Sequence, residues 1–304
     1  MSELLQIEGT KEARRRERPR WLKIRYRATP ELEHVQGLVN ELKLHTVCQS
    51  AACPNLAECW AAGTATFMLG GNLCTRSCGF CDVPTGRPAP LDADEPRRVA
   101  QGIRELGLRF AVVTAVARDD VKDGGAAHFA ATLAAIHELA PGVQVEVLIP
   151  DFKGSESALR TVLEARPDVL NHNLETVERL TRQVRKQAKY ARSLEVLAMS
   201  RRLAPEIPTK TGLMLGLGEE RDELRRTLAE IRATGCSLLT LGQYLRPSPA
   251  HLAVERYVSP DEFEVWADEA RALGFTEVAA GPLVRSSYRA ESLARAAAES
   301  HTPR

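Results

Sequence analysis

The chain has 304 residues, of which 44% are hydrophobic and 27% charged, and its formal net charge at pH 7 is +1. This balance is typical of a soluble globular protein, and a single α/β barrel commonly reaches this length. The small net charge gives no general attraction to nucleic acid or to a membrane surface, and no apolar run is long enough to span a membrane. We therefore expect a cytoplasmic protein without nucleic-acid or membrane partners.

The N-terminal region contains a basic stretch. Residues 1–10 lack the continuous apolar segment of a secretory signal, so no export is expected. Lys11–Arg27 then carries nine Lys or Arg residues. Glu12 and Glu17 interrupt it, which argues against a transit peptide, because such peptides contain few acids. The stretch fits a solvated arm leading into the fold. The alternative is that the arm, with Trp21 among its charges, docks an acidic protein partner.

The cysteines are concentrated in one region of the sequence. Six of the seven lie within residues 48–81, and they form two triplets: Cys48, Cys53 and Cys59, then Cys74, Cys78 and Cys81. Because no export signal is present, disulfides are disfavoured and the cluster predicts metal binding. Neither triplet has the two close pairs of a zinc finger. Three soft thiolates leave one iron of a cubane cluster open, so two [4Fe–4S] clusters are predicted.

The second triplet has a spacing of i, i+4 and i+7, which would also suit the buried face of a helix. Glycines and prolines oppose that interpretation, because Gly70-Gly71-Asn72 precedes the triplet and Pro84-Thr85-Gly86 follows it. We therefore predict a loop. The first triplet fits a helical period less well, and Pro54 breaks its segment. The seventh cysteine, Cys236, is predicted to be a buried structural thiol.

Seven short apolar or β-branched runs are expected to be strands, and they alternate with helix-length amphipathic segments. They are residues 65–69, 110–114, 143–149, 169–171, 209–215, 238–241 and 277–279. Two helices have readable starts: Pro96 stands at the first helical position before Arg97–Leu106, and Ser259–Glu262 forms a capping box. Gly107 and Gly274 are expected to end these helices. The alternation predicts right-handed βαβ units with the function at the C-terminal ends of parallel strands.

Three motifs resemble those of a known family. The sequence CTRSCGFC of Cys74–Cys81 resembles the signature of the radical S-adenosylmethionine (SAM) superfamily. The preceding Cys48–Cys59 segment resembles the auxiliary-cluster motif of lipoyl synthases, and Arg285–Tyr288, RSSY, resembles the closing motif of that family. The resemblance runs from about Trp21 to Tyr288. The motifs occur in the order of that family, so the chain is identified as a candidate lipoyl synthase family member.

This resemblance implies a fold and a division of the chain. The expected fold is α/β, a partial (β/α)6 TIM-like barrel of the radical SAM type with N- and C-terminal extensions. The barrel would occupy residues 65–280. Residues 1–64 would form an N-terminal extension with the auxiliary-cluster motif, and residues 281–304 a C-terminal segment that closes the auxiliary cluster.

The resemblance also implies an activity: radical-mediated insertion of two sulfur atoms at C6 and C8 of a protein-bound octanoyl chain. The cofactors would be SAM and two [4Fe–4S] clusters. Cys74, Cys78 and Cys81 would hold the cluster that binds SAM. The cluster on the first triplet would donate sulfur, with the Ser287 hydroxyl on its fourth iron. No physical argument from the sequence distinguishes Ser286 from Ser287 as the iron ligand.

The implied partners are proteins. The substrate would be an octanoylated carrier of the lipoyl-domain or glycine cleavage H protein type. An electron donor such as ferredoxin or flavodoxin and a protein that reloads the auxiliary cluster would also be needed. The alternatives are another radical SAM enzyme that inserts sulfur or transfers methylthio groups, or, from a different class, a zinc-binding interaction module.

Four polar residues at or near predicted strand ends are expected to contact SAM or the substrate: Arg118, Asn171, Asn173 and Glu219. A buried hydrogen-bonding role is an equally open interpretation of each. His172, which lies between the two asparagines, is predicted to be a core histidine with satisfied hydrogen bonds.

Overall fold

The computed structural model describes residues 18–22, 30–50, 53, 55–61, 64–288 and 290–291. Of the basic stretch Lys11–Arg27, only residues 18–22 belong to this part, so the predicted solvated arm and its alternative docking role both lie largely outside the described residues. Trp21, in a 3₁₀ turn over Arg20–Leu22, is 45% exposed. The described residues contain no helix that is both long enough and apolar enough to cross a bilayer.

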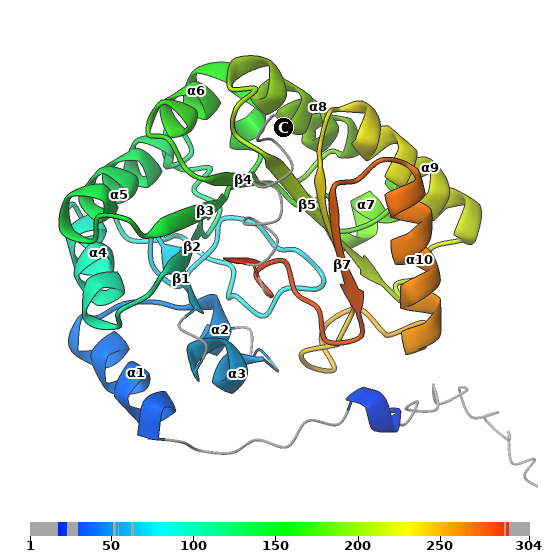
Figure 1. Cartoon of the computed structure of the whole chain (residues 1–304), viewed down its shortest axis with the longest axis horizontal. Helices are drawn as coiled ribbons and strands as arrows, with labels where there is room; N and C mark the ends of the chain where they lie inside the picture. Colours follow the sequence, from blue (N-terminus) through cyan, green and yellow to red (C-terminus); the bar gives the residue numbers. More distant parts are fainter. Residues whose placement is uncertain are drawn as a thin grey trace, which may run out of the picture.

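Seven parallel strands form one sheet, and their order in space is their order in the chain. They are β1 (Thr64–Leu69), β2 (Phe110–Ala115), β3 (Gln144–Leu148), β4 (Val169–Asn171), β5 (Thr209–Leu215), β6 (Leu238–Gln243) and β7 (Glu277–Gly281). All seven predicted strands are therefore confirmed. In the described part of the chain β1 and β7 do not pair, so the barrel is open on that side, as expected of a partial barrel (Figure 1).

Ten α-helices are described, and most surround the sheet on its outer face (Figure 1). They are α1 (Pro30–Glu41), α2 (Val47–Ser50), α3 (Leu56–Ala61), α4 (Glu95–Glu105), α5 (Ala126–Leu139), α6 (Glu156–Glu164), α7 (Glu178–Val184), α8 (Tyr190–Leu203), α9 (Arg221–Ala233) and α10 (Pro260–Ala272). Six βα units thus precede β7. Gly107 and Gly274, both with positive φ, follow α4 and α10, which confirms the two predicted helix ends.

The capping box predicted at the start of α10 is only half formed. The Ser259 hydroxyl accepts a hydrogen bond from the Glu262 backbone N–H at 3.2 Å, as predicted. The Glu262 carboxylate, however, pairs with the Arg256 guanidinium at 2.7 Å and 3.0 Å. A charge-assisted bidentate contact is stronger than a single bond to a backbone N–H, which explains the difference.

Strand side chains alternate between two environments. Outward positions such as Val113 and Val147 are fully buried against the helices. The inward positions next to them include buried polar groups: Glu146 pairs with Lys210 at 2.8 Å and accepts a hydrogen bond from Asn171 at 2.7 Å. The N-terminal end of the barrel is closed by an apolar layer from alternate strands and the C-terminal segment: Phe110, Val112, Val169, Leu238 and Ala290.

The N-terminal extension covers the free edge of β1. The Met68 N–H donates to the His45 carbonyl at 2.8 Å, and Thr46 forms an antiparallel bridge with Phe67. Both α2 and α3 contact this strand. Because an unpaired strand edge would expose backbone hydrogen-bonding groups, this cover stabilises the open side of the barrel and places the first cysteine triplet there.

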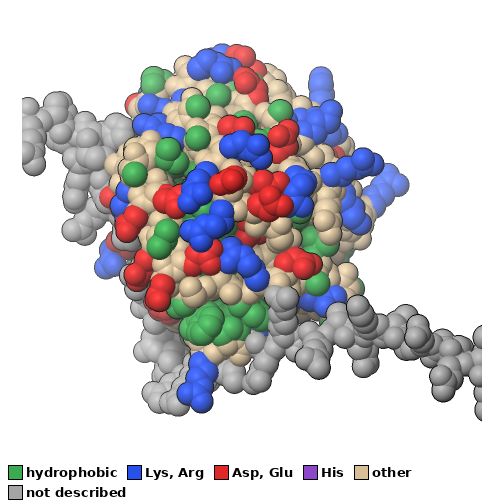
Figure 2. Space-filling model, turned by 90° about the vertical axis from the view of Figure 1, so that its right-hand side faces the viewer, with side chains coloured by type: hydrophobic (Ala, Val, Ile, Leu, Met, Phe, Trp, Pro, Cys, Tyr) green, Lys and Arg blue, Asp and Glu red, His purple; other side chains and the backbone are tan. Residues whose placement is uncertain are grey.

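The opposite side of the molecule, over α9 and α10, has interspersed basic and acidic side chains (Figure 2). Arg225 pairs with Glu269 at 2.9 Å, and Arg271 with Asp268 at 2.7 Å. Neither sign of charge forms a continuous field on this face.

Candidate functional site

The second cysteine triplet lies on the loop that follows β1, at the C-terminal end of the strand, as predicted. Gly70 and Gly71 turn the chain there with φ of 77° and 88°. The loop closes on itself: the Cys74 N–H donates to the Pro84 carbonyl and the Gly86 N–H to the Cys74 carbonyl, both at 2.9 Å. No helix includes Cys74, Cys78 or Cys81, so the predicted loop is confirmed over the helical alternative.

Arg76, between the first two cysteines of the loop, anchors it to the neighbouring strands. Its guanidinium bonds to both carboxylate oxygens of Asp119 at 2.7 Å and 2.8 Å, and to Asp151 at 2.7 Å. Asp151 is fully buried and also pairs with Arg192 at 3.2 Å. Burial alone would raise the pKa of Asp151, but the hydrogen bond and charge of Arg76 lower it to about 2. The carboxylate is therefore a fixed anion that holds the loop in place.

Two other segments hold the far end of the loop. The Gly79 N–H donates to the Val184 carbonyl at 2.9 Å, and its carbonyl accepts from the Leu252 N–H at 3.1 Å. The His251 ring approaches the Cys81 carbonyl at 3.0 Å. Contacts from several barrel segments thus hold the loop.

The loop thiols are close enough to influence one another. Burial raises the pKa of Cys78 to about 12, with the nearby Arg185 acting in the opposite direction and Cys81 and Cys74 raising it further. Burial also raises the pKa of Cys81 to about 11, with a contribution from Cys74. These two thiols are protonated at neutral pH, so a metal must displace their protons on binding.

The first triplet is distributed over two short helices. Cys48 lies in α2 and Cys59 in α3, with Cys53 between them. The Cys53 N–H donates to the Cys48 carbonyl at 3.0 Å, and the Cys59 N–H to the Asn55 carbonyl at 2.8 Å. Burial raises the pKa of Cys59 to about 12, and Cys53 and Cys48 add to this effect. The three thiols therefore form a second local group.

The C-terminal segment after β7 reaches this second group, and Figure 1 shows it turning back from β7. The Asn55 side chain donates to the Leu283 carbonyl at 2.7 Å. The Tyr288 hydroxyl donates to the Glu58 carboxylate at 3.0 Å. Ser286 and Ser287 lie between these two anchors and are half-buried. The structure therefore brings the predicted closing motif to the first triplet.

Gly242, at the end of β6, is needed for this approach. A Cβ at Gly242 would collide with the backbone carbonyl of Val284. The absence of a side chain lets the C-terminal segment cross directly over the strand.

Both triplets fit iron–sulfur clusters. All seven cysteines are free thiols, so no disulfide competes for the six in the triplets. Each group offers three soft sulfur donors, the ligands that such clusters require. Among the described residues no set of His, Cys, Asp or Glu side chains is arranged to hold a single metal ion. A cubane uses wider spacing, because each thiolate binds a different iron.

Two of the four residues predicted to contact SAM or substrate are fully engaged by the protein. Arg118 is 2% exposed and bonds to Asp120 at 2.8 Å and to the Ala89 carbonyl at 2.9 Å. The Glu219 carboxylate accepts from the Gly216 and Leu217 backbone N–H groups at 2.7 Å and 2.9 Å. These contacts match the hydrogen-bonding interpretation of both residues.

The other two predicted residues, Asn171 and Asn173, each have a side-chain oxygen that accepts no hydrogen bond. The Asn171 side chain donates to Glu146, and the Asn173 side chain donates to Glu175 at 3.0 Å. In both residues the amide oxygen is buried and has no partner. A buried unpaired acceptor is costly, so it marks a position where a ligand donor would be favourable.

Sequence reasoning missed Glu175. This residue has a φ of 70°, which is rare outside glycine. Burial raises the pKa of its carboxyl group, and its charge in turn raises the pKa of Cys78 and Cys81. It therefore lies near the loop triplet. The only sequence signal was an acid two residues after Asn173, just beyond a strand.

The two remaining predictions concern buried residues, and both are confirmed. His172 is 1% exposed, and its ring nitrogens contact the Ile149 carbonyl at 2.9 Å and the Ser193 hydroxyl at 3.0 Å. Burial lowers the pKa of His172 to about 4, so the ring is neutral. Cys236 is fully buried, and its thiol donates to the Thr209 carbonyl at 3.3 Å.

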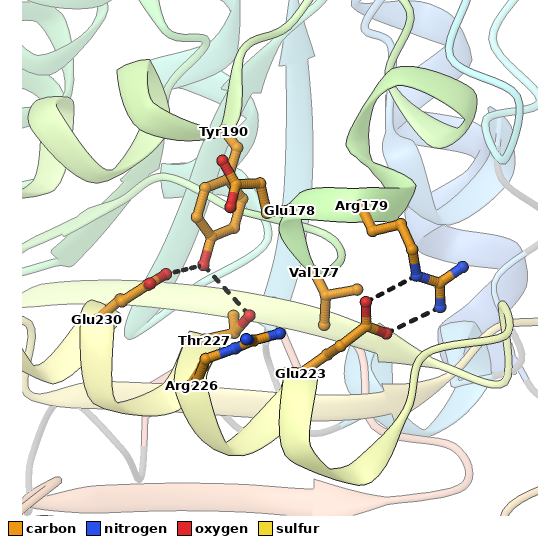
Figure 3. Close-up of a pocket in the computed structure, with 8 residues that line it drawn as sticks. All are labelled: Val177, Glu178, Arg179, Tyr190, Glu223, Arg226, Thr227 and Glu230. Carbon is orange, nitrogen blue, oxygen red and sulfur yellow. Dashed lines mark hydrogen bonds and ion pairs between the residues drawn. The ribbon is translucent and has the colours of Figure 1, made fainter.

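A cavity of about 230 Å³ lies elsewhere, among α7, α8 and α9 in the outer helical layer (Figure 3). Its charged and hydroxyl groups largely pair with one another: Arg179 with Glu223 at 2.7 Å, and the Tyr190 hydroxyl with Glu230 at 2.6 Å. None of the cysteines lines this cavity.

Comparison with known proteins gives a consistent picture. Residues 68–231 match the radical SAM superfamily. A lipoyl synthase of Nocardioides sp. is 54% identical over 282 residues, covering 93% of this chain and 89% of the relative. Those of Caldanaerobacter subterraneus and Thermus thermophilus are 53% and 54% identical, covering 91% of this chain and 98% and 86% of theirs.

Solved structures resemble the fold. Methylornithine synthase superposes with a TM-score of 0.51 at 12% identity, covering 92% of this chain and 95% of that one. Streptococcus suis SuiB, solved with S-adenosylmethionine bound, gives a TM-score of 0.55 at 10% identity, covering 81% of this chain and 60% of that one. At these identities the likeness concerns the fold alone.

Proposed function

Because this chain belongs to the lipoyl synthase family of radical SAM enzymes, we propose that its two cysteine triplets hold the two [4Fe–4S] clusters of the reaction. The reaction of the family is the insertion of two sulfur atoms at C6 and C8 of a protein-bound octanoyl chain, with SAM as cofactor. The observation that carries the assignment is the meeting of the RSSY segment with the first triplet through Asn55 and Glu58.

The triplets have different roles in this proposal. Cys74, Cys78 and Cys81 bind the cluster that presents SAM, and Cys48, Cys53 and Cys59 bind the auxiliary cluster. When bound, these groups supply an electron, a hydrogen-abstracting 5′-deoxyadenosyl radical and sulfur, which no side chain provides. The contribution of the chain is to hold both sites at one end of a barrel whose walls limit access of water.

Ser287 is proposed as the oxygen ligand of the auxiliary cluster. A hard hydroxyl oxygen is more easily displaced from iron than a thiolate, which suits a cluster that must give up sulfur. The supporting observation is that the pair Ser286–Ser287 lies between Leu283 and Tyr288, both of which bond to the segment around the first triplet. Ser287→Ala should therefore abolish sulfur insertion while Ser286→Ala retains most of it, as measured by mass spectrometry of the carrier.

SAM is proposed to bind beside the loop triplet, where Asn173 and Glu175 face it. The unpaired Asn173 oxygen and the Glu175 carboxylate are acceptors suited to hydroxyl or ammonium groups. The unpaired Asn171 oxygen is a further candidate contact deeper in the barrel. Arg118 and Glu219 take part by shaping the loops after β2 and β5. Glu175→Gln should weaken SAM binding, measured by calorimetry, with iron content unchanged.

The substrate is an octanoylated carrier protein. We propose that a ferredoxin or flavodoxin supplies electrons, that another protein rebuilds the auxiliary cluster, and that the reaction takes place in the cytoplasm, where thiols stay reduced. The proposed organisation is an extension over residues 1–64, the barrel over 65–280 and a closing segment over 281–304.

The decisive experiment is anaerobic incubation of the reconstituted protein with reductant, SAM and an octanoylated carrier. The mass of the carrier should change by the gain of two sulfur atoms and the loss of two hydrogen atoms. A carrier that lacks the octanoyl chain should remain unchanged. Formation of 5′-deoxyadenosine without any sulfur in the carrier would contradict the proposed activity.

A further inference from the structure

Arg285 occupies a fixed position beside the first triplet. Its guanidinium donates to the carbonyl of Val284 at 2.7 Å and to that of Gln243, at the end of β6, at 3.4 Å. Leu283 and Tyr288, on either side of it in sequence, are the two residues tied to the segment around Cys53 and Cys59. The position of the guanidinium is therefore fixed by its own contacts at the end of β6 and by the contacts of its segment with the residues around the first triplet.

Within the described part of the chain, Arg285 has no balancing acid. No carboxylate there forms an ion pair with it, and its guanidinium donates its two hydrogen bonds to neutral carbonyls. Its nearby charged or ionisable groups are the Cys53 thiol and a second cation, Arg18. Burial lowers the pKa of Arg285, Cys53 raises it and Arg18 lowers it. A guanidinium nevertheless stays protonated, so positive charge accumulates here without an anion from the residues that the structure describes.

Such an arrangement is costly unless an anion is supplied. Taking a cation out of water is unfavourable, and only an opposite charge or several good hydrogen bonds offset the loss. Elsewhere in the same fold, Arg76 shows the usual solution, with two carboxylates at 2.7 Å. At Arg285 the described ionisable group that can supply negative charge is Cys53 of the first triplet, whose thiols lose their protons when they bind iron.

We propose that the Arg285 guanidinium is the fixed counter-charge of the auxiliary cluster, raising its reduction potential and slowing its loss of iron. This inference rests on the proposed function. The three thiolates outweigh the positive charge of an oxidised cubane core, and reduction adds a further negative charge. A nearby cation therefore favours the reduced form and opposes dissociation of the anionic site, since net charge is one determinant of cluster potential.

The test uses the full chain with Cys74, Cys78 and Cys81 changed to alanine, so that only the auxiliary site is loaded. Into this parent we would introduce Arg285→Gln, which removes the charge, or Arg285→Lys, which keeps it. Arg160→Gln removes one charge from the exposed face of α6 as a matched control. The readouts are the midpoint potential from redox titration and the rate of iron release to a chelator.

Arg285→Gln should lower the reduction equilibrium constant about tenfold, which is about 59 mV for one electron, and should speed iron release several-fold. Arg285→Lys and Arg160→Gln should stay close to the parent. Arg285→Gln could also lose the cluster completely while circular dichroism shows that the protein is folded. In that case, a cluster retained by Arg285→Lys would support the proposal as well, because the lysine keeps the charge.

Two results would overturn the counter-charge role: a parent-like potential and iron-release rate in Arg285→Gln, or equal shifts in the Gln and Lys variants, which would show that shape rather than charge matters. A parent that binds no iron at all would instead contradict the assignment of Cys48, Cys53 and Cys59. The iron content of the parent therefore distinguishes failure of the proposed function from failure of this inference.

Discussion

Cys74, Cys78 and Cys81 lie on one loop after β1, whereas the first triplet uses two short helices and is approached by a segment from the other end of the chain. The loop is held by Arg76, which contacts the buried carboxylate of Asp151 and the partly exposed carboxylate of Asp119. The first triplet has instead a cation beside it, Arg285, that pairs with no carboxylate of the described residues. In the proposed assignment, the cluster that binds SAM thus takes its three thiolates from one short loop, whereas the auxiliary cluster, which gives up sulfur, is completed by a distant segment.

Removing the thiols of one site at a time is the strongest test of this comparison, because each site loses its metal donors. Changing the loop triplet to alanine should abolish 5′-deoxyadenosine formation. Changing Cys48, Cys53 and Cys59 to alanine should leave that product but reduce lipoyl formation below detection. Each variant should keep about half of the iron, which a colorimetric assay measures. Loss of 5′-deoxyadenosine formation in both variants would show that the sites are not independent.

Adding one methyl group at Gly242 should affect the auxiliary site alone. A Cβ there collides with the Val284 carbonyl and displaces the C-terminal segment. Gly242→Ala should therefore reduce sulfur insertion by about a hundredfold, in line with the effect of a 1 Å misplacement, while SAM cleavage continues. Gly281→Ala is the matched control, because its Cβ would lie at an ordinary 3.4 Å from a Val284 methyl group. The rates of lipoyl and 5′-deoxyadenosine formation are the measurements.

Removing the buried charge of Asp151 should affect the loop and the stability of the fold. Its pKa of about 2, compared with 3.8 ordinarily, corresponds to roughly 2 kcal/mol of pH-dependent stability. Because the folded pKa is the lower one, this stability is present above about pH 4 and is lost as the pH falls through 2. Urea unfolding of the wild type and Asp151→Asn should differ most near neutral pH and converge in acid. A difference that does not change with pH would contradict this role.

The smallest effect is expected at Cys236, the cysteine outside both sites. Cys236→Ala removes a buried thiol and its bond to the Thr209 carbonyl, at a cost of about 1 kcal/mol. Iron content and lipoyl formation should equal those of the wild type, and only the unfolding midpoint should decrease. A lower iron content in this variant would mean that the assignment of six cysteines to two sites is incomplete.

The sequence predicted the strands and the loop triplet because both depend on local patterns. Val145 and Val147 are two residues apart along β3 and therefore share one buried face of the strand, and Gly70 and Gly71 mark the turn after β1. The closing motif was recognised through its resemblance to a family. Its contact with the first triplet, through Asn55, joins segments 228 residues apart in sequence, and no local pattern predicts such a contact.

The missed features depend on competition between side chains in space. Glu262 was predicted to complete a capping box, but Arg256 takes its carboxylate. Glu175 became a candidate only when its positive φ and its influence on Cys78 were visible. That Arg285 pairs with no carboxylate of the described residues likewise depends on which groups lie near it in space, and sequence spacing contains no such information.

The crossing of the C-terminal segment over β6 has a consequence for the order in which the two sites mature. The chain is synthesised from its N-terminus, so the loop after β1 and the carboxylates Asp119 and Asp151 emerge from the ribosome well before Arg285 and Ser287. The Arg76 anchors of the loop are therefore synthesised early, whereas its contacts with Leu252 and His251 must form later. In the proposed assignment, the auxiliary site is therefore completed later than the loop, because its closing segment follows β6 and β7 in the chain.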